Sequence, residues 1–274
     1  MPTPPRITDR TFFVEYTAHP RPQSLGALWA QFAALEIAPD NMRGADTLPM
    51  LAFANDVASV HSSQIEGNSL DLNFFMQSKQ RGEVAKPKKR EFQEIEDVRA
   101  AYNFAQEHSL TEQHFLHAHK TLSKRFLITS KRGNYRNHGM MIQSAGGIEY
   151  VAIEEEYIPE AMQQFWNGIE HLKQQDLSPS EAFYHAALLH LVFVHIHPFS
   201  DGNGRSVRLL EKWFLAHHLG KRAWHIPSET LYLEHRKAYF ANIKLGVNYY
   251  ELDYSRAMPF LLMLPEALTI FLDS

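Results

Sequence analysis

The sequence of 274 residues has no cysteine. Disulfide bonds and thiolate chemistry are therefore excluded, and the composition fits a reducing compartment, so we expect a cytoplasmic protein. The N-terminus, Met-Pro-Thr-Pro-Pro-Arg, also lacks the apolar segment of a signal peptide. Apolar runs are interrupted by His, Pro or Glu and are too short to span a bilayer, so no membrane association is expected.

A strong excess of charge of either sign is missing as well. The formal net charge of −4 gives no general attraction to nucleic acid. A basic run occurs at residues 86–90, but it contains a proline and acidic residues follow it, so we interpret it as a solvated linker. Hydrophobic residues make up 45% of the chain, enough for a sizeable core in one large domain or two small ones.

Helical spacing of apolar residues dominates the rest of the sequence, and no internal repeat is present. The start at Ser178-Pro179-Ser180-Glu181 suits a helix N-cap, and the apolar run that follows indicates a central buried helix. We expect an all-α fold of about ten helices, preceded by an extended arm at residues 1–22. The helices are predicted at residues 25–35, 48–65, 69–82, 92–107, 111–122, 156–172 and 179–196, around Val207, Leu210 and Phe214, and at residues 229–246 and 254–272.

Two segments depart from simple helical spacing. Residues 40–46 read as a loop. At residues 138–151, apolar residues that include Ile142 and Ile148 flank Ser-Ala-Gly-Gly, which indicates a β-hairpin. A plain surface hairpin is the simplest interpretation, and an isolated two-stranded hairpin is only marginally stable.

The most informative stretch lies between two predicted helices and reads His-Ile-His-Pro-Phe-Ser-Asp-Gly-Asn-Gly-Arg-Ser-Val-Arg over residues 195–208. Gly202 and Gly204 allow a sharp bend and a close approach of the backbone to a ligand. The following helix begins with N–H groups that attract anions. Arg205 and Arg208 stand near this helix start, where the helix dipole disfavours cations, so an anion would stabilise them.

Two further side chains of this stretch suggest chemistry. Asp201 could hold Mg²⁺ against phosphate oxygens. His197 could accept a proton from an attacking group. The residues therefore predict a polyphosphate site with a metal ligand and a general base, whereas the alternative is an ordinary turn followed by a solvated helix start.

A second informative stretch, Ser62 to Asn68, ends the helix predicted at residues 48–65. Gly67 suits the position after the last helical turn. Glu66 is a carboxylate in that last turn, where the dipole disfavours it. An isolated, solvent-facing glutamate is the simplest interpretation of this residue.

Three histidines on the central helix raise the question of zinc. His185, His190 and His195 are each five residues apart, so successive side chains are rotated by roughly 140° around the helix. No His-Glu-x-x-His pattern occurs in the sequence. We therefore expect no structural metal at these histidines.

Residues 197–208 resemble the signature of the Fic family, His-x-Phe-x-(Asp/Glu)-Gly-Asn-Gly-Arg-x-x-Arg, at every defined position. The resemblance implies a Fic-type helical bundle with a β-hairpin flap over the active site. It also implies the family's activity, the transfer of AMP from ATP to a hydroxyl side chain of a target protein. A kinase-like branch of the family has Lys in place of Gly204, and this chain does not.

The resemblance assigns a role to each residue of the signature. His197 is the base that deprotonates a target Ser, Thr or Tyr, and Phe199 packs into the core. Asp201 binds Mg²⁺ at the α- and β-phosphates. The residues that contact the nucleotide phosphates are Gly202, Asn203 and Gly204, which line an anion hole, and Arg205 and Arg208, which bind the β- and γ-phosphates.

Other segments also resemble the family. Ser62-x-x-x-Glu66-Gly67 is similar to the inhibitory motif (Ser/Thr)-x-x-x-Glu-(Gly/Asn), which implies that Glu66 pairs with Arg208. Residues 133–136, Gly-Asn-Tyr-Arg, are similar as well, and the hairpin with Ile142 and Ile148 corresponds to a flap that clamps the target by main-chain pairing. Asn248 and Tyr249 stand where the family has part of its adenine pocket, although helix capping and core packing explain them as well.

The resemblance therefore implies an autoinhibited protein adenylyltransferase that uses ATP and Mg²⁺. Its partners would be ATP and an unidentified protein with a hydroxyl side chain, and self-modification and homo-oligomer formation stay open. Two alternatives are a hydrolase that removes AMP through Glu66 and a non-catalytic nucleotide sensor. The expected regions are an N-terminal part at residues 1–109 with the inhibitory motif at 62–67, a Fic core at 110–253 and a C-terminal helix at 254–274.

Overall fold

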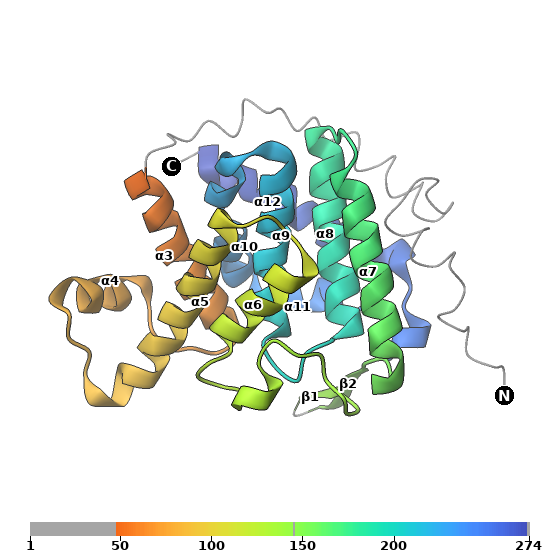
Figure 1. Ribbon diagram of the computed structural model, residues 1–274, viewed down its shortest axis with the longest axis horizontal. Coiled ribbons are helices and arrows are strands. Elements are labelled where there is room, and N and C mark those ends of the chain that lie inside the picture. The colour runs from red at the N-terminus through yellow and green to blue at the C-terminus, as the bar shows by residue number, and fades with distance from the viewer. Residues whose placement is uncertain (1–47, 145, 273–274) are drawn as a thin grey trace.

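The computed structural model describes residues 48–144 and 146–272. Within these residues it contains ten α-helices and one two-stranded antiparallel hairpin, so the predicted all-α fold is confirmed (Figure 1). The arm at residues 1–22, the helix at 25–35 and the loop at 40–46 lie outside the described residues. The elements are α3 (Leu48–Ile65), α4 (Leu72–Arg81), α5 (Lys89–Glu107), α6 (Glu112–Leu122), β1 (Met141–Ser144), β2 (Gly147–Val151), α7 (Ile158–Lys173), α8 (Pro179–Ile196), α9 (Asn203–Leu219), α10 (Ser228–Glu234), α11 (Arg236–Ile243) and α12 (Met258–Leu272).

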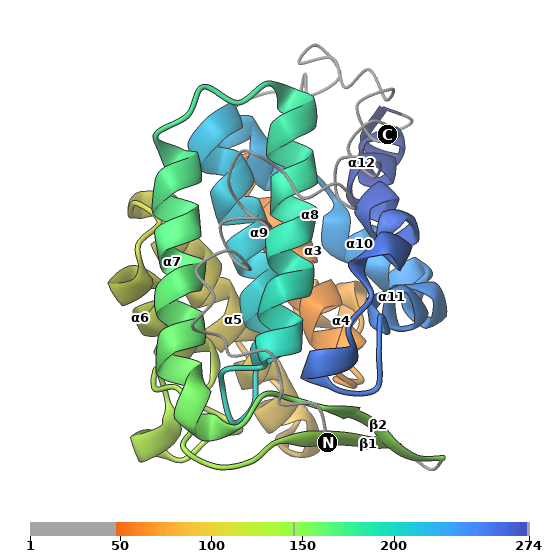
Figure 2. The ribbon, with the colours of Figure 1, turned by 90° about the vertical axis from the view of Figure 1, so that its right-hand side faces the viewer.

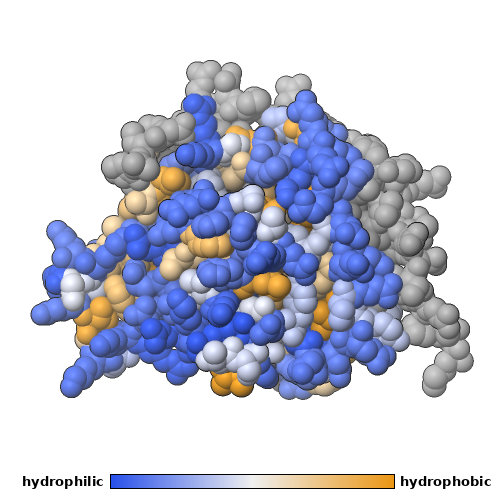
Figure 3. All heavy atoms as spheres, in the orientation of Figure 1, coloured by the Kyte–Doolittle hydropathy of each residue, from blue (hydrophilic) through white to orange (hydrophobic). Residues whose placement is uncertain are grey.

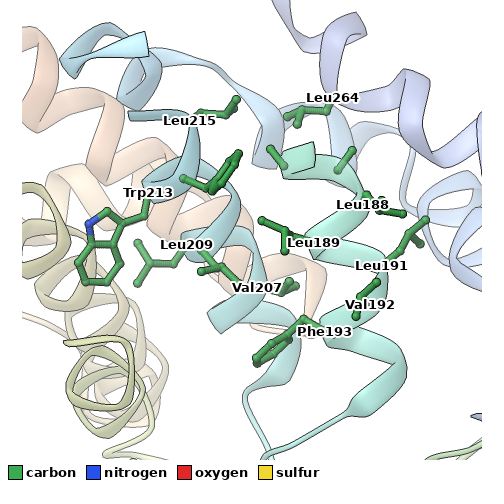
Figure 4. Packing of buried hydrophobic residues seen from close by; sticks show 14 of the residues in the cluster. Leu188, Leu189, Leu191, Val192, Phe193, Val207, Leu209, Trp213, Leu215 and Leu264 are labelled. Carbon is green, nitrogen blue, oxygen red and sulfur yellow. The ribbon is translucent and has the colours of Figure 1, made fainter. Parts of the chain in front are cut away.

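Helix α8 is the central element of the fold (Figure 2). It begins as predicted: Ser178 accepts from the N–H of Glu181, and Glu181 accepts in return from the N–H of Ser178. Helices α7, α9 and α12 pack against it. Figure 4 shows the α8–α9 contact, where Leu189 and Phe193 of α8 lie close to Val207 of α9. This apolar contact fixes the relative position of the two helices that flank residues 197–202.

The N-terminal helices pack beside this centre. Helix α3 contacts α5 and α10, and α5 contacts α6. Helix α4, capped by Asp71 and ended by Gly82 at φ 69°, projects at the left of Figure 1 over a small separate apolar cluster. Helix α3 is thereby held with its C-terminal end near the start of α9.

Two sequence predictions need correction. The basic run at residues 86–90 is mostly exposed, as predicted for a solvated linker, but it is not irregular, because Lys86–Lys88 form a 3-10 turn and α5 begins at Lys89. The helix predicted at residues 229–246 is two helices, α10 and α11, which meet at His235 with φ −102° and ψ 32°. The break turns the second helix, so His235 and Ala238 are exposed and Tyr239 is buried instead.

The predicted hairpin is present. Met141 pairs with Val151, Ile142 with Tyr150 and Gln143 with Ile148, so Glu149 is the extra residue of a bulge. The N–H of Val151 donates to the carbonyl of Val247 at 3.0 Å, so the segment after α11 covers part of the outer edge of β2.

The surface in Figure 3 is mainly hydrophilic, and its hydrophobic residues occur in small separate groups. Among residues 48–144 and 146–272, no helix combines the length and the apolar character needed to cross a membrane.

Candidate active site

The signature residues form a tight loop between α8 and α9. His197 ends α8 with φ 52°, and Gly202 precedes α9 with φ 82°. Asn203 closes the loop, because its Oδ1 accepts from the N–H of Phe199 and its Nδ2 donates to the carbonyl of Phe199, both at 2.9 Å. Phe199 is fully buried and stacks on His119 with ring centroids 3.6 Å apart. The predicted packing of Phe199 into the core is therefore confirmed.

Two side chains from outside the signature support this loop. Arg136 donates to the carbonyl of His197 at 2.8 Å, and the backbone N–H of Arg136 donates to the carbonyl of Pro198 at 2.7 Å. His119 accepts from the N–H of Gly133 at Nδ1, so its Nε2 carries the proton that is donated to the carbonyl of Asp201 at 3.0 Å. The loop is thus held at both ends by groups that are 61 and 82 residues away in the sequence.

A cavity of about 320 Å³ opens beside this loop. The volume is in the range of small-molecule sites. It brings together residues from α3, the hairpin, α8, α9 and α11. Its lining includes Glu66, Ile142, Glu149, Tyr150, His197, Asn203, Gly204, Tyr239 and Lys244.

The two predicted stretches meet at Arg208 and Glu66. Arg208 Nη2 lies 2.7 Å from Glu66 Oε1, and Arg208 also donates to the side-chain and backbone oxygens of Ser62, each at 2.9 Å. Gly67 ends α3 with φ 99°, which glycine tolerates. The pairing of Glu66 with Arg208, implied by the family resemblance, is therefore present in the structure.

The Glu66 carboxylate lies against the start of α9. A Cβ atom on Gly204 would overlap Glu66 Oε1, so the carboxylate lies against the first turn of α9 because residue 204 is glycine. Burial would raise the pKa of Glu66, but Arg208 and Arg205 together hold this pKa below its ordinary value. Burial would likewise lower the pKa of Arg208, yet Tyr239 and Glu66 raise it above its ordinary value. The pair is therefore fully ionised near neutral pH.

Arg205 points to a different side of α9. It forms an ion pair with Glu94 of α5 and stacks over the ring of Phe126, with its Cζ atom 3.7 Å from the ring centroid. Burial raises the pKa of Glu94, although Arg205 opposes this shift. Asp201 lies beside the pair, 3.5 Å from Arg205 Nη2, and its side chain is 51% exposed.

The tautomer and the protonation state of His197 are set by its surroundings. Its Nδ1 lies 3.2 Å from the carbonyl of Val194, and because a carbonyl only accepts, Nδ1 carries the hydrogen and Nε2 is the acceptor. Burial lowers the pKa of His197 to about 4. The ring is therefore neutral at pH 7.

Some predicted residues lie apart from the cavity. Asn248 and Tyr249 are not among its lining residues. Asn248 instead accepts from the N–H groups of Tyr250 and Glu251 at 3.0 and 3.1 Å, which is the capping role. Ile142 lines the cavity, whereas Ile148 is 59% exposed and does not line it.

The histidines of α8 make hydrogen bonds to protein groups. His190 contacts Glu211 and Tyr239, and His195 contacts Tyr254 and the carbonyl of Ile243. No group of three or more His, Cys, Asp or Glu residues suited to a metal ion occurs in the described part of the chain.

The sequence did not indicate four residues of this neighbourhood: Glu94, His119, Arg136 in its bonding role, and Tyr239. Arg136 belongs to the family-like segment 133–136, which was the one available signal. Glu94, His119 and Tyr239 had none, because each is an ordinary residue of an amphipathic helix until the helices pack.

Residues 109–215 match the family model described as Fic/DOC family. Similar solved structures include a Fic family protein from Desulfovibrio desulfuricans G20, with TM-score 0.68, 21% identity and coverage of 91% of this chain and 73% of that chain. A Fic domain containing signalling protein from Bacteroides thetaiotaomicron VPI-5482 has TM-score 0.61 and 21% identity, and the match covers 92% of this chain and 96% of that chain. For Fic-1 from C. elegans the TM-score is 0.57 and the identity is 20%, and the match covers 96% of this chain and 71% of that chain.

No curated protein matches the sequence. The structural matches, all near 20% identity, establish a shared fold. The family match covers α6 to most of α9 and includes the whole loop from His197 to Arg208. Residues 109–215 therefore match the Fic/DOC family, and the chain that contains them has the fold of Fic proteins.

Proposed function

We propose that this chain is a protein adenylyltransferase, which moves AMP from ATP to a hydroxyl group of a target protein and is restrained by Glu66. The observation that carries the proposal is the position of the Glu66 carboxylate. It lies against the first turn of α9, bonded to Arg208, in the cavity that His197 also lines. An internal carboxylate thus stands where a nucleotide phosphate would stand.

The start of α9 suits a polyphosphate. Gly202 precedes the helix without any side-chain cap, so the first N–H groups of α9 are available to an anion. Arg208 and Arg205 add two cations on neighbouring sides of the same turn. Arginine binds phosphate oxygens through two parallel N–H bonds, which fixes the orientation of the phosphate as well as its affinity.

The transfer would proceed at the α-phosphorus of ATP. The proton of the target hydroxyl moves to Nε2 of His197 while the hydroxyl oxygen forms a bond to phosphorus. The bond from the α-phosphorus to the oxygen that bridges to the β-phosphate breaks, and pyrophosphate leaves with that electron pair. The products are an AMP ester of the target side chain and pyrophosphate.

The residues present fit a magnesium ion carried by the nucleotide. Mg²⁺ usually takes one or two protein carboxylates and completes its shell with phosphates and water. Asp201 offers one half-exposed carboxylate beside the start of α9, and the described residues contain no larger ligand cluster. The ion, when bound, would offset the negative charge of the phosphates. Asp201 would position it, and His119 would hold the backbone of Asp201 in place.

Restraint follows from competition for Arg208. While Glu66 holds Nη2 of Arg208, this group cannot bind the γ-phosphate, and ATP would settle with its α-phosphorus displaced from the hydroxyl. A displacement of about 1 Å can cost roughly 10²-fold in rate. Release of Glu66 would free Arg208 and restore the alignment.

The position of Glu66 also suits a second activity, the hydrolytic removal of AMP from a modified target. Its side chain is 28% exposed and faces the cavity that contains His197, so it could orient a water molecule toward phosphorus. The two activities respond in opposite ways to Glu66→Gly: transfer should rise and hydrolysis of a pre-modified target should fall.

The test measures incorporation of AMP from α-labelled ATP into proteins of a cognate lysate and into the chain itself. Glu66→Gly should incorporate more label than the unsubstituted protein. Glu66→Gln keeps the size of the side chain without its charge, so an intermediate gain would separate charge pairing from steric blockage. Adding Arg208→Ala to Glu66→Gly should cancel the gain. ATP binding without label transfer in every variant would favour the non-catalytic sensor and contradict the proposal.

A further inference from the structure

Arg208 keeps three hydrogen bonds that do not involve Glu66. Two go to Ser62, from Nε to Oγ and from Nη2 to the carbonyl, and the third goes from Nη1 to the hydroxyl of Tyr239 at 3.2 Å. Arg208 and Tyr239 are 0% and 1% exposed. When Glu66 withdraws, the guanidinium would therefore stay in place, and only the Nη2 donor that faced Glu66 would become available.

The Tyr239 hydroxyl belongs to a buried chain of hydrogen bonds. It lies 3.0 Å from His190 Nε2, and His190 Nδ1 lies 2.8 Å from Glu211 Oε2. Arginine only donates, so the Tyr239 oxygen accepts from Arg208 and its own proton is directed to His190 Nε2. The His190 proton then lies on Nδ1 and is donated to Glu211. In this chain of hydrogen bonds, Glu211 thus orients His190 and His190 orients Tyr239. The hydroxyl of Tyr239 in turn orients Arg208.

This chain of hydrogen bonds connects three helices. Arg208 and Glu211 are three residues apart on α9 and lie on one side of it. His190 comes from the centre of α8 and Tyr239 from α11. Because these side chains are buried, their hydrogen bonds are costly to break, and the network strongly favours one geometry.

We infer that Tyr239 is a positioning residue for Arg208. Its hydroxyl, oriented by His190 and Glu211, fixes the plane of the guanidinium so that the Nη2 donor released by Glu66 faces the β- and γ-phosphates of the nucleotide. Tyr239 also lines the cavity, so it lies beside the place that the phosphates would occupy. The inference rests on the proposed function, because it takes Arg208 as a phosphate ligand.

Tyr232 of α10 is a matched control in the same network. Its hydroxyl donates to Glu211 Oε2 at 2.9 Å, it is 0% exposed, and its ring centroid lies 4.7 Å from that of Tyr239. Within the described residues its hydroxyl has no hydrogen bond to Arg208. Tyr239→Phe and Tyr232→Phe each remove one buried hydroxyl next to Glu211 or His190, so the difference between them isolates the contact with Arg208.

The first experiment measures the affinities of ATP and AMP by calorimetry in the Glu66→Gly background. Tyr239→Phe should weaken ATP binding about tenfold, as expected when a hydrogen bond to a charged group is lost. AMP lacks the β- and γ-phosphates, so its affinity should change less than about twofold, and Tyr232→Phe should leave both affinities within the same range. Equal effects of the two substitutions, or equal losses for ATP and AMP, would overturn the inference.

A second measurement does not depend on the proposed function. Arginine-selective ¹⁵N NMR follows the guanidinium of Arg208, identified by the signal that disappears in Arg208→Lys. Tyr239→Phe should shift this signal and accelerate its exchange with water, whereas Tyr232→Phe should leave it unchanged. If Glu66→Gly neither binds ATP nor transfers AMP, the proposed function fails, and the NMR signal still decides the positioning role. An Arg208 signal that is insensitive to Tyr239→Phe would refute that role.

Discussion

At the scale of single residues, the site combines groups whose protonation is set by their surroundings. His197 is neutral because burial lowers its pKa to about 4, and the carbonyl of Val194 fixes its hydrogen on Nδ1. Glu66 is ionised although it is partly buried, because Arg208 and Arg205 offset the effect of burial on its pKa. The neutral imidazole of His197 and the ionised carboxylate of Glu66, which pairs with Arg208, therefore line the same cavity.

His197→Ala should abolish AMP transfer and leave ATP affinity nearly unchanged, because the imidazole acts on the hydroxyl proton and not on the nucleotide. A positioned base contributes about 10²–10⁴-fold to a rate. Label incorporation is measured in the Glu66→Gly background, with ATP affinity from calorimetry as the control for folding. Transfer above about a tenth of the parent rate would reject His197 as the base.

Asp201→Ala should raise the Mg²⁺ concentration needed for half-maximal transfer, because one oxygen ligand and one negative charge are lost. Excess Mg²⁺ should restore part of the activity. Asp176→Ala, which removes an exposed aspartate between α7 and α8, is the matched control and should leave the Mg²⁺ titration unchanged. Identical titrations for the two variants would show that Asp201 is not a ligand.

At the scale of secondary-structure elements, the proposed function depends on how α3 and the hairpin meet the α8–α9 loop. Helix α3 places Ser62 and Glu66, one helical turn apart, against Arg208 of α9. The hairpin lines one part of the cavity, and β2 is bonded to the segment after α11 through Val151.

The contact between α3 and α9 should contribute to stability as well as to restraint. Glu66→Gln should lower the free energy of unfolding at pH 7 by about 1–3 kcal/mol, because Arg208 loses a charged partner. ATP should restore the melting temperature by binding the freed arginine. Since the pKa of Glu66 is lowered in the folded state, its contribution is present above its unfolded value of 4.5 and is lost as the pH falls below that value. The difference in melting temperature between the two proteins should therefore stay constant from pH 7 to about pH 5 and shrink as the pH falls below 4.5, and a difference that stays constant below pH 4.5 would contradict the ionic role.

The hairpin should act on the target rather than on the nucleotide. Ile148→Ala, at an exposed position that does not line the cavity, should reduce target modification and leave ATP affinity unchanged. Ile128→Ala removes an isoleucine that is 65% exposed outside the hairpin and is the matched control. A loss of ATP affinity equal to the loss of modification would indicate a general folding defect instead.

At the scale of the whole molecule, the core around α8 contains histidines that stay neutral in the folded state at pH values where the unfolded chain would protonate them. His195 is 3% exposed and bonds to Tyr254 and to the carbonyl of Ile243. Burial lowers its pKa, like that of His197, to about 4. These histidines accept protons far more readily in the unfolded chain.

The fold should accordingly weaken in mild acid. Because the folded pKa values of His195 and His197 lie below the ordinary value of 6.5, the stability linked to them is complete above pH 6.5 and is lost as the pH falls toward 4. The melting temperature, measured by circular dichroism, should fall between pH 7 and pH 5. His195→Gln, which cannot titrate, should flatten this dependence although it lowers stability at pH 7. An equal slope in both proteins would exclude His195 as a source of the acid sensitivity.

The helices, the hairpin and the loop from His197 to Arg208 could be predicted from the sequence, because each depends on local spacing, capping residues and glycines. The start of α8 at Ser178 and the end of α3 at Gly67 are examples. The break at His235 could not be predicted, since no local signal marks it, and it decides that Tyr239 rather than Ala238 faces the core. The sequence left two roles open for Asn248, a helix cap and a contact to the adenine of the nucleotide.

The sequence by itself determined the chemistry that is available: an imidazole, a carboxylate, an anion-binding helix start and two arginines within twelve residues, together with a second carboxylate at Glu66. Only the tertiary structure decided the partners of the two arginines. Arg208 takes Glu66 and Tyr239, and Arg205 takes Glu94, across 142, 31 and 111 residues of sequence. Such pairings depend on how helices cross, and helix crossing is fixed by the packing of the whole core and not by the spacing within any one helix.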